Sequence, residues 1–177
     1  RQFAEMWRLM TEAGSRTPDA DFDLVEAAAS NGQLARDILD AAQAADPEFY
    51  AAIRLHLVEP GAAARAAQRE TLAPHATKLT SSSSRLPDAV HGVIYGNELL
   101  DALPVHSVVM TDHGLREHYI DLHDGALVER VGHPSSEALE RYFTTLKVEL
   151  QPGMRAEVNL SAVAWMTGAC LGLHRGF

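Results

Sequence analysis

The sequence predicts an α/β fold, with a parallel sheet covered by helices on both faces and an antiparallel meander added after it. Strand-like and helix-like segments alternate through residues 2–95, which is the pattern of a parallel sheet. After Pro104 the pattern changes to short alternating strands separated by turn signals. The 177 residues are 46% hydrophobic and 22% charged, an ordinary globular balance that supports a domain with a real core.

The elements of the parallel part follow from hydrophobic spacing and from breaker residues. Apolar residues at helical spacing predict helices, and β-branched runs bounded by small or polar residues predict strands. The serine run 81–84 is expected to be a loop, because the next strand follows within a few residues. In order, the predicted elements are a helix at 2–10, a polar loop at 14–21, a strand at 22–26, a helix at 33–45, a strand at 53–58, a helix at 62–72, a short strand at 77–80 and a strand at 90–95.

The second half of the chain reads as a meander followed by helices. Asp112-His113-Gly114 and His123-Asp124-Gly125 are turn signals between alternating segments, so we expect hairpins there. Ser135 or Ser136 is expected to cap the helix that follows the meander. In order, the predicted elements are strands at 105–110, 115–122 and 127–131, a helix at 135–146, an extended segment at 154–159 and a helix at 161–173.

The charge balance and the single cysteine limit the classes of partner and compartment. Net charge is −9 with no basic patch, so nucleic acid and anionic membranes are poor candidate partners. Cys170 is the one cysteine, which excludes an internal disulfide and fits a reducing compartment such as the cytoplasm. The sequence shows neither a signal peptide nor a membrane span, since the apolar run 162–173 is too short.

The stretch 93–104 is the sharpest single feature. An apolar β-branched run stops abruptly, Asn97 and Glu98 follow, and a short apolar turn carries Asp101. Because ligands bind outside the carboxyl ends of the strands in an open α/β sheet, these three side chains are candidates for chemistry. The structural alternative is that Asn97 caps a short helix whose positive end Glu98 and Asp101 favour. Both roles can hold at once.

Two earlier strand ends also carry residues suited to a ligand. Glu26 ends the first strand and is followed by Ala28, Ser30 and Gly32, a turn of small residues before a helix. Glu59 ends the second strand, where an acid can accept hydrogen bonds from the two ribose hydroxyls of an adenosine ligand. A surface acid in a β–α turn remains the structural alternative for Glu59.

Other chemistry-bearing residues favour structural roles. His113, His118 and His123 recur every five residues, so alternation along a strand prevents all three from converging, and we expect no metal site. Cys170 is expected to be a core residue on an apolar helix face. The serine run could place hydroxyls near the adenine end of a ligand, but a simple loop is the favoured interpretation.

These residues together resemble one family, the SAM-dependent methyltransferases of MidA type, where SAM is S-adenosyl-L-methionine. The string Asn-Glu-Leu-Leu-Asp-Ala-Leu-Pro at 97–104, followed by Val105-His106, is the most specific match. The likeness extends to Glu26–Leu39, to 57–60 with Gln68 and Leu72, and to 116–118 and 152–158, and therefore runs through nearly the whole chain. Mitochondrial members of that family are complex I assembly factors that methylate an arginine of a core subunit.

The resemblance implies a Rossmann-like class I SAM-methyltransferase sheet, truncated, with the antiparallel β meander as an insertion. It divides the chain into a SAM-binding core at 1–104, a meander at 105–134 and a helical segment at 135–177 that leads into a missing C-terminal strand. Arg1 begins inside a predicted helix and Arg175-Gly176 is typical of the approach to a strand, so we expect a piece of a longer protein.

The resemblance also implies roles for individual residues. Glu26, Ala28, Ser30 and Gly32 correspond to the cofactor loop and Glu59 to the acid on the ribose. Asn97, Glu98 and Asp101 would line the site of methyl transfer, where the two carboxylates can hold a guanidinium in bidentate fashion. The implied cofactor is SAM and the implied partner a protein substrate, with the oligomeric state left open to a homodimer.

The cofactor loop departs from the family pattern at two positions. The family reads approximately Glu-x-Gly-x-Gly-x-Gly, whereas this chain has Ala28 and Ser30 at the first two glycines. If either position needs a positive φ angle, its Cβ costs roughly 1–2 kcal/mol of strain. Two alternatives to an active methyltransferase follow: a non-catalytic relative that acts as an assembly partner, and a nicotinamide-binding Rossmann domain, which lacks a convincing phosphate loop.

Overall fold

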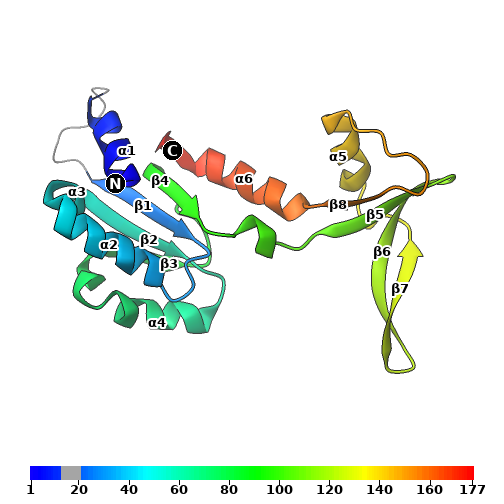
Figure 1. Ribbon diagram of the computed structural model, residues 1–177, viewed down its shortest axis with the longest axis horizontal. Coiled ribbons are helices and arrows are strands. Elements are labelled where there is room, and N and C mark those ends of the chain that lie inside the picture. Colours follow the sequence, from blue (N-terminus) through cyan, green and yellow to red (C-terminus); the bar gives the residue numbers. More distant parts are fainter. Residues whose placement is uncertain (13–20) are drawn as a thin grey trace. The chain divides into compact units, whose positions relative to one another are not determined.

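The computed structural model describes residues 1–12 and 21–177, and within them it contains two compact units. The first unit comprises Arg1–Leu99 with Met166–Phe177, and the second comprises Leu100–Trp165 (Figure 1). The predicted polar loop at 14–21 lies, up to residue 20, outside the described residues. Each unit has its own sheet.

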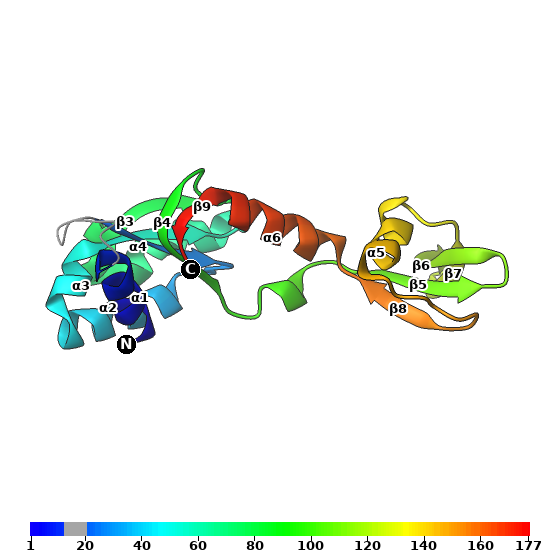
Figure 2. The same cartoon turned by 90° about the horizontal axis from the view of Figure 1, so that it is seen from above.

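The first unit is built on a five-stranded parallel sheet in the order β3-β2-β1-β4-β9 (Figures 1 and 2). From the central strand β1 the chain moves outward to β2 and β3, then returns to the other side of β1 for β4. The carboxyl ends of β1 and β4 therefore form a topological switch point, where open α/β sheets bind ligands. The strands are β1 Phe22–Ala27, β2 Ile53–Val58, β3 Leu79–Ser83, β4 Val90–Gly96 and β9 Leu173–Gly176.

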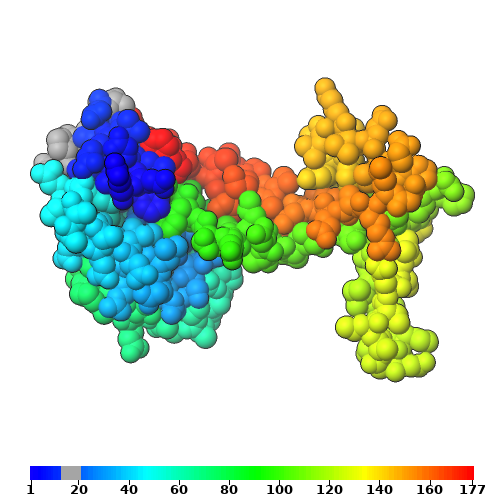
Figure 3. Space-filling view, viewed as in Figure 1, coloured from blue at the N-terminus to red at the C-terminus, as the bar shows by residue number. Residues whose placement is uncertain are grey.

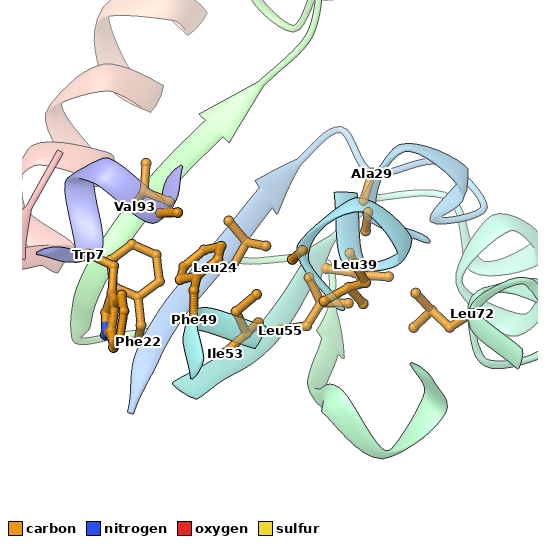
Figure 4. Packing of buried hydrophobic residues seen from close by; sticks show 14 of the residues in the cluster. Trp7, Phe22, Leu24, Ala29, Leu39, Phe49, Ile53, Leu55, Leu72 and Val93 are labelled. Carbon is orange, nitrogen blue, oxygen red and sulfur yellow. The ribbon is translucent and has the colours of Figure 1, made fainter. Parts of the chain in front are cut away.

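The main core of this unit lies where helices cover one face of the sheet (Figure 4). All six residues of β1 are buried, as expected for a central strand covered on both faces. Phe22, Leu39 and Leu55 have no exposed surface, and burying such a side chain contributes about 1.5–3 kcal/mol. The helices are α1 Gln2–Met10, α2 Gln33–Ala45, α3 Pro47–Ala52 and α4 Ala62–Leu72, followed by the 3₁₀ segment η2 Ala73–Lys78.

Three elements of the first unit differ from the sequence prediction. The serine run is strand rather than loop, because Ser81–Ser83 pair in register with His56–Val58 of β2. Helix α3 was not predicted, although Asp46 caps it by accepting from the Phe49 amide at 3.1 Å and Pro47 occupies its first turn. The last helix leads into β9, which pairs with β4, so the prediction that a strand after this helix is missing is wrong.

The second unit is a four-stranded antiparallel sheet in the order β7-β6-β5-β8, with one helix packed on one face. The predicted meander is confirmed, and the extended segment at 154–159 becomes its fourth strand. The β6–β7 hairpin extends beyond the part that the helix covers (Figure 3), which leaves Ile120, Leu122 and Leu127 exposed. The elements are β5 His106–Thr111, β6 Gly114–His123, β7 Ala126–Gly132, α5 Ala138–Leu146 and β8 Arg155–Val158.

Helix α6, Leu160–Gly172, contains the second boundary between the units. Cys170 on this helix is exposed, so its predicted place in the core is wrong. The helix is apolar on all sides, and the spacing of its residues therefore cannot indicate which face is buried. Among the helices of the described residues, none is both long and apolar enough to cross a membrane.

Candidate active site at the carboxyl ends of the strands

The carboxyl ends of β1, β2 and β4 meet at one edge of the first unit. Glu26 lies in register with Leu57 of β2 and with Tyr95 of β4. Ala27 is paired with both Val58 and Gly96, so the residues that follow these positions leave the sheet at the same edge. Parallel pairing thus brings three separate segments of the chain to one place: the loop after Glu26, Glu59, and the stretch that begins at Asn97.

The loop after β1 has the left-handed backbone conformation at alternate positions. The φ angles are 57° at Ala28, 47° at Ser30 and 85° at Gly32. These are the three positions that the resemblance predicts to be glycine, and at two of them a Cβ lies on a backbone conformation that favours glycine. Each such residue costs about 1–2 kcal/mol of backbone strain. At Gly32 a Cβ would also lie 3.1 Å from Leu57 Cδ1, which explains why glycine is needed there.

Glu59 joins this loop to the turn after β2. Its carboxylate accepts hydrogen bonds from the Ser30 amide at 2.9 Å and from the Gly61 amide at 2.7 Å. The Ala29 amide donates to the Val58 carbonyl at 3.1 Å, which ties the two turns a second time. A carboxylate offers about four acceptor positions, so two remain for other donors such as the hydroxyls of a diol.

Gln68 holds the same loop from its other side. The side chain of Gln68, on α4, is fully buried, and its Nε2 donates to the Ser30 carbonyl at 2.8 Å. Ser82 Oγ on β3 donates to Gln68 Oε1 at 2.6 Å. The sequence included Gln68 in the family likeness but indicated no structural role for it. A glutamine inside an alanine-rich helix carries no signal that distinguishes solvation from burial.

Glu26 is a buried acid beneath the loop. Tyr95 Oη donates to Glu26 Oε2 at 3.1 Å, and the Ala35 amide in the first turn of α2 also bonds the carboxylate. Burial raises the pKa of Glu26 to about 7, against the opposing effect of these two donors. The ring of Tyr95 packs against Phe3 with centroids 5.0 Å apart, which fixes the hydroxyl. Glu26 thus changes its charge near neutral pH.

The end of β4 has a different character. Asn97 and Glu98 are exposed, and Glu98 has a φ angle of 52°. The predicted cap is wrong: the left-handed turn at Glu98 prevents an α-helix from starting at Asn97, and only the 3₁₀ turn η3, Leu100–Ala102, follows. Asp101 is exposed in that turn and belongs to the second unit.

Five of the predicted site residues therefore lie together in the structure, and the remaining ones follow β4. Around Glu59 it assembles the loop of Glu26, Ala28, Ser30 and Gly32. Asn97 and Glu98 begin the neighbouring strand end in the same unit. Within residues 1–12 and 21–177, no group of three or more histidine, cysteine or acidic side chains could hold a metal ion. The site offers backbone amides, a carboxylate with remaining acceptor positions, and a second acid near neutral pKa.

Comparison with known proteins gives one family and several solved structures, two of which are described here. The whole chain, residues 1–177, matches the family described as "Putative S-adenosyl-L-methionine-dependent methyltransferase". An uncharacterized protein from Burkholderia thailandensis matches with 28% identity and a TM-score of 0.77 over 99% of this chain. A "likely methyl transferase" from the same organism, bound to S-adenosyl-homocysteine, matches with 27% identity and a TM-score of 0.70 over 99% of this chain.

The chain spans 44% of the first of these structures and 45% of the second. No functionally curated protein matches it. The structural likeness supports the α/β fold with a parallel sheet predicted from the sequence. The family match extends over the full length, well beyond the few strand-end motifs. The chain therefore belongs to a family of S-adenosyl-L-methionine-dependent methyltransferases.

Proposed function

We propose that this protein transfers a methyl group from SAM to a protein side chain, with an arginine guanidinium as the acceptor. The observation that supports it most directly is the loop after β1, which keeps the left-handed backbone at all three glycine positions and is bonded to Glu59. A structural relative with 27% identity was solved with S-adenosyl-homocysteine, the product that remains once SAM has lost its methyl group. The MidA-type assignment belongs to this proposal.

The residues at the strand ends fit such a cofactor. Glu59 would hold the ribose, because its carboxylate has acceptor positions left after binding the Ser30 and Gly61 amides. The loop at 28–32 would bring backbone close to the methionine part, with Glu26 beneath it. When bound, SAM supplies a methyl group on a sulfonium, and its transfer is an in-line displacement in which positioning dominates.

The acidic residues after β4 are proposed to hold the acceptor. Glu98 and Asp101 are exposed carboxylates, and a carboxylate can bind a guanidinium through two parallel hydrogen bonds. Such a carboxylate can also take the proton that the acceptor nitrogen loses. Asn97 can orient the acceptor through its amide. The net charge of −9 favours the approach of a cationic protein segment. A cytoplasmic location and a homodimer remain predictions from the sequence.

The second candidate is a non-catalytic relative that retains the fold as an assembly or interaction partner. Two side chains favour it: Ala28 and Ser30 stand at left-handed positions where the family has glycine. Their Cβ atoms can crowd a cofactor that approaches the backbone. This candidate predicts an intact fold that does not bind SAM.

Calorimetric titration with S-adenosyl-homocysteine tests the proposal. We expect the protein to bind it, and Glu59→Gln to weaken binding by at least about 100-fold, because a charge-assisted acceptor is replaced by an amide. Glu70→Gln, which changes an exposed acid on α4, is the matched control and should bind like the wild type. Absence of binding by the wild type at millimolar ligand would favour the non-catalytic candidate.

Acceptor specificity needs a separate measurement. Mass spectrometry of an arginine-containing peptide and its lysine counterpart, each incubated with protein and SAM, should show methylation of the arginine peptide. Glu98→Gln and Asp101→Asn should lower this turnover while leaving the affinity for S-adenosyl-homocysteine unchanged. Methylation of the lysine peptide instead would overturn the arginine assignment but not the methyltransferase.

A further inference from the structure

Gln68 is the fully buried polar side chain that lies against the cofactor loop. It comes from α4, yet both of its polar atoms bond partners outside that helix: the Ser30 carbonyl and the Ser82 hydroxyl. Its Cγ lies 3.6 Å from where a Cβ on Gly32 would be. A buried amide is costly unless its groups are paired, so this arrangement requires both partners.

The Ser30 carbonyl determines which way the amide of Gln68 faces, because a carbonyl only accepts and the NH₂ group must therefore point toward it. The Ser82 hydroxyl is also bonded at 2.6 Å, and it donates because Gln68 Oε1 only accepts. The Ser82 hydroxyl thus satisfies and holds the oxygen end of the Gln68 amide. Ser82 itself is fixed because β3 pairs with β2, with Ser82 in register with Leu57. The edge strand of the sheet thus helps to hold a side chain that reaches the loop after β1.

Ser30 is held at both ends of its backbone. Its amide donates to Glu59 Oε2 at 2.9 Å and its carbonyl accepts from Gln68 Nε2 at 2.8 Å. The residue between these two bonds has a φ angle of 47°, a conformation that a serine adopts reluctantly. Two fixed hydrogen bonds on either side of a strained residue are what allow such a conformation to persist.

We propose that Gln68, held by Ser82, is a positioning residue that keeps Ser30 of the cofactor loop in the left-handed conformation. The inference rests on the proposed function, since the conformation matters because the loop would hold SAM. It explains how this chain retains the shape of the loop with serine at a glycine position. Gln68 acts through Ser30 and Glu59 and need not contact the cofactor.

A double-mutant cycle with Gln68→Met and Ser30→Gly tests the proposal. Methionine keeps the volume of glutamine and removes both hydrogen bonds, so Gln68→Met should weaken S-adenosyl-homocysteine binding about tenfold. Glycine needs no restraint at positive φ, so adding Ser30→Gly should restore the affinity to within about twofold of wild type. A buried residue with only a packing role would give no such rescue. Gln43→Met, an exposed glutamine of α2, is the control and should bind normally.

A second measurement does not depend on the cofactor. Amide hydrogen exchange of Ser30, followed by NMR in the ligand-free protein, should be faster in Gln68→Met than in the wild type. If the wild type fails to bind S-adenosyl-homocysteine, the proposed function fails, but this measurement still tests whether Gln68 holds Ser30 in place. If Gln68→Met does not fold, Ser82→Ala replaces it, with about threefold weaker binding and the same rescue. Unchanged exchange, or a loss of affinity that Ser30→Gly does not rescue, would overturn the inference.

Discussion

The two neighbouring strand ends of the first unit achieve their local shape in opposite ways. After β1, the sequence departs from the family at Ala28 and Ser30, but the backbone is held by Glu59 and Gln68. After β4, the string at 97–104 is the stretch on which the resemblance to the family chiefly rests, and the side chains of Asn97 and Glu98 lie exposed to solvent. The end of β1 is thus held in shape by contacts, whereas the end of β4 is recognised by the identity of its residues.

This difference indicates which part of each end a ligand would use. Where backbone shape does the binding, side chains can change as long as other groups maintain the shape, as Gln68 does for Ser30. Where side chains do the binding, they must remain free to reach a partner, and their identity matters more than their packing. The left-handed residue Glu98 fits this view, because strained residues cluster at functional sites.

The largest difference between the two strand ends is expected in the pH dependence of stability, and it comes from the buried acid Glu26. Its pKa is raised from 4.5 to about 7 by burial, so between these values the folded state binds more protons than the unfolded chain. Stability from this group is therefore lost as pH rises from about 4.5 to 7, by on the order of 3 kcal/mol. Glu26→Gln should remove this loss, which urea denaturation at a series of pH values measures.

Tyr95→Phe tests whether the titration of Glu26 causes this pH dependence of stability. It removes a donor that lowers the pKa of Glu26, so the loss of stability should begin at the same pH and continue to a higher one. Parallel stability curves for the wild type and Glu26→Gln between pH 4.5 and 7 would show that Glu26 is not the group responsible. The opposite signs of the two variants separate the charge of Glu26 from simple repacking.

A smaller effect is expected from restoring the loop glycines. Ala28→Gly with Ser30→Gly relieves two left-handed positions, and after subtracting the entropy of glycine the fold should gain about 1–2 kcal/mol. Thermal unfolding measures this gain. If S-adenosyl-homocysteine binds only to the double variant, the natural chain is the non-catalytic relative. A less stable double variant would mean that the left-handed backbone carries no strain here.

Most of the fold could be predicted because hydrophobic periodicity reports burial directly. The alternation of strands and helices, the switch at Pro104 and the meander are patterns of apolar spacing, which the sheets confirm. The serine run at 81–83 was misjudged because its strand is set by main-chain pairing with β2, which no serine side chain reveals. Cys170 was misplaced because an all-apolar helix has no pattern to follow.

The candidate site was predictable where residue identity carries the signal. Glu26, Ser30 and Glu59 were expected at adjoining strand ends, and parallel pairing brings them together. The contacts of Gln68 and Ser82 were not predictable, because they join residues 14 and 38 positions apart through side-chain geometry. Spacing along the chain identifies the elements of a site, whereas the groups that hold those elements in shape require the packed structure.

The smallest effect is expected at Glu98, where two substitutions separate backbone strain from the chemical role of the carboxylate. Its φ angle of 52° disfavours every residue with a Cβ, so Glu98→Ala should leave stability unchanged, whereas Glu98→Gly should gain about 0.5–1 kcal/mol. Both variants remove the carboxylate, so both should lower methylation of the arginine peptide equally. Chemical denaturation and turnover measured on the same pair separate the two roles. If Glu98→Gly is no more stable than Glu98→Ala, the left-handed turn after β4 is not strained, and the exposed carboxylate alone distinguishes this strand end from the one after β1.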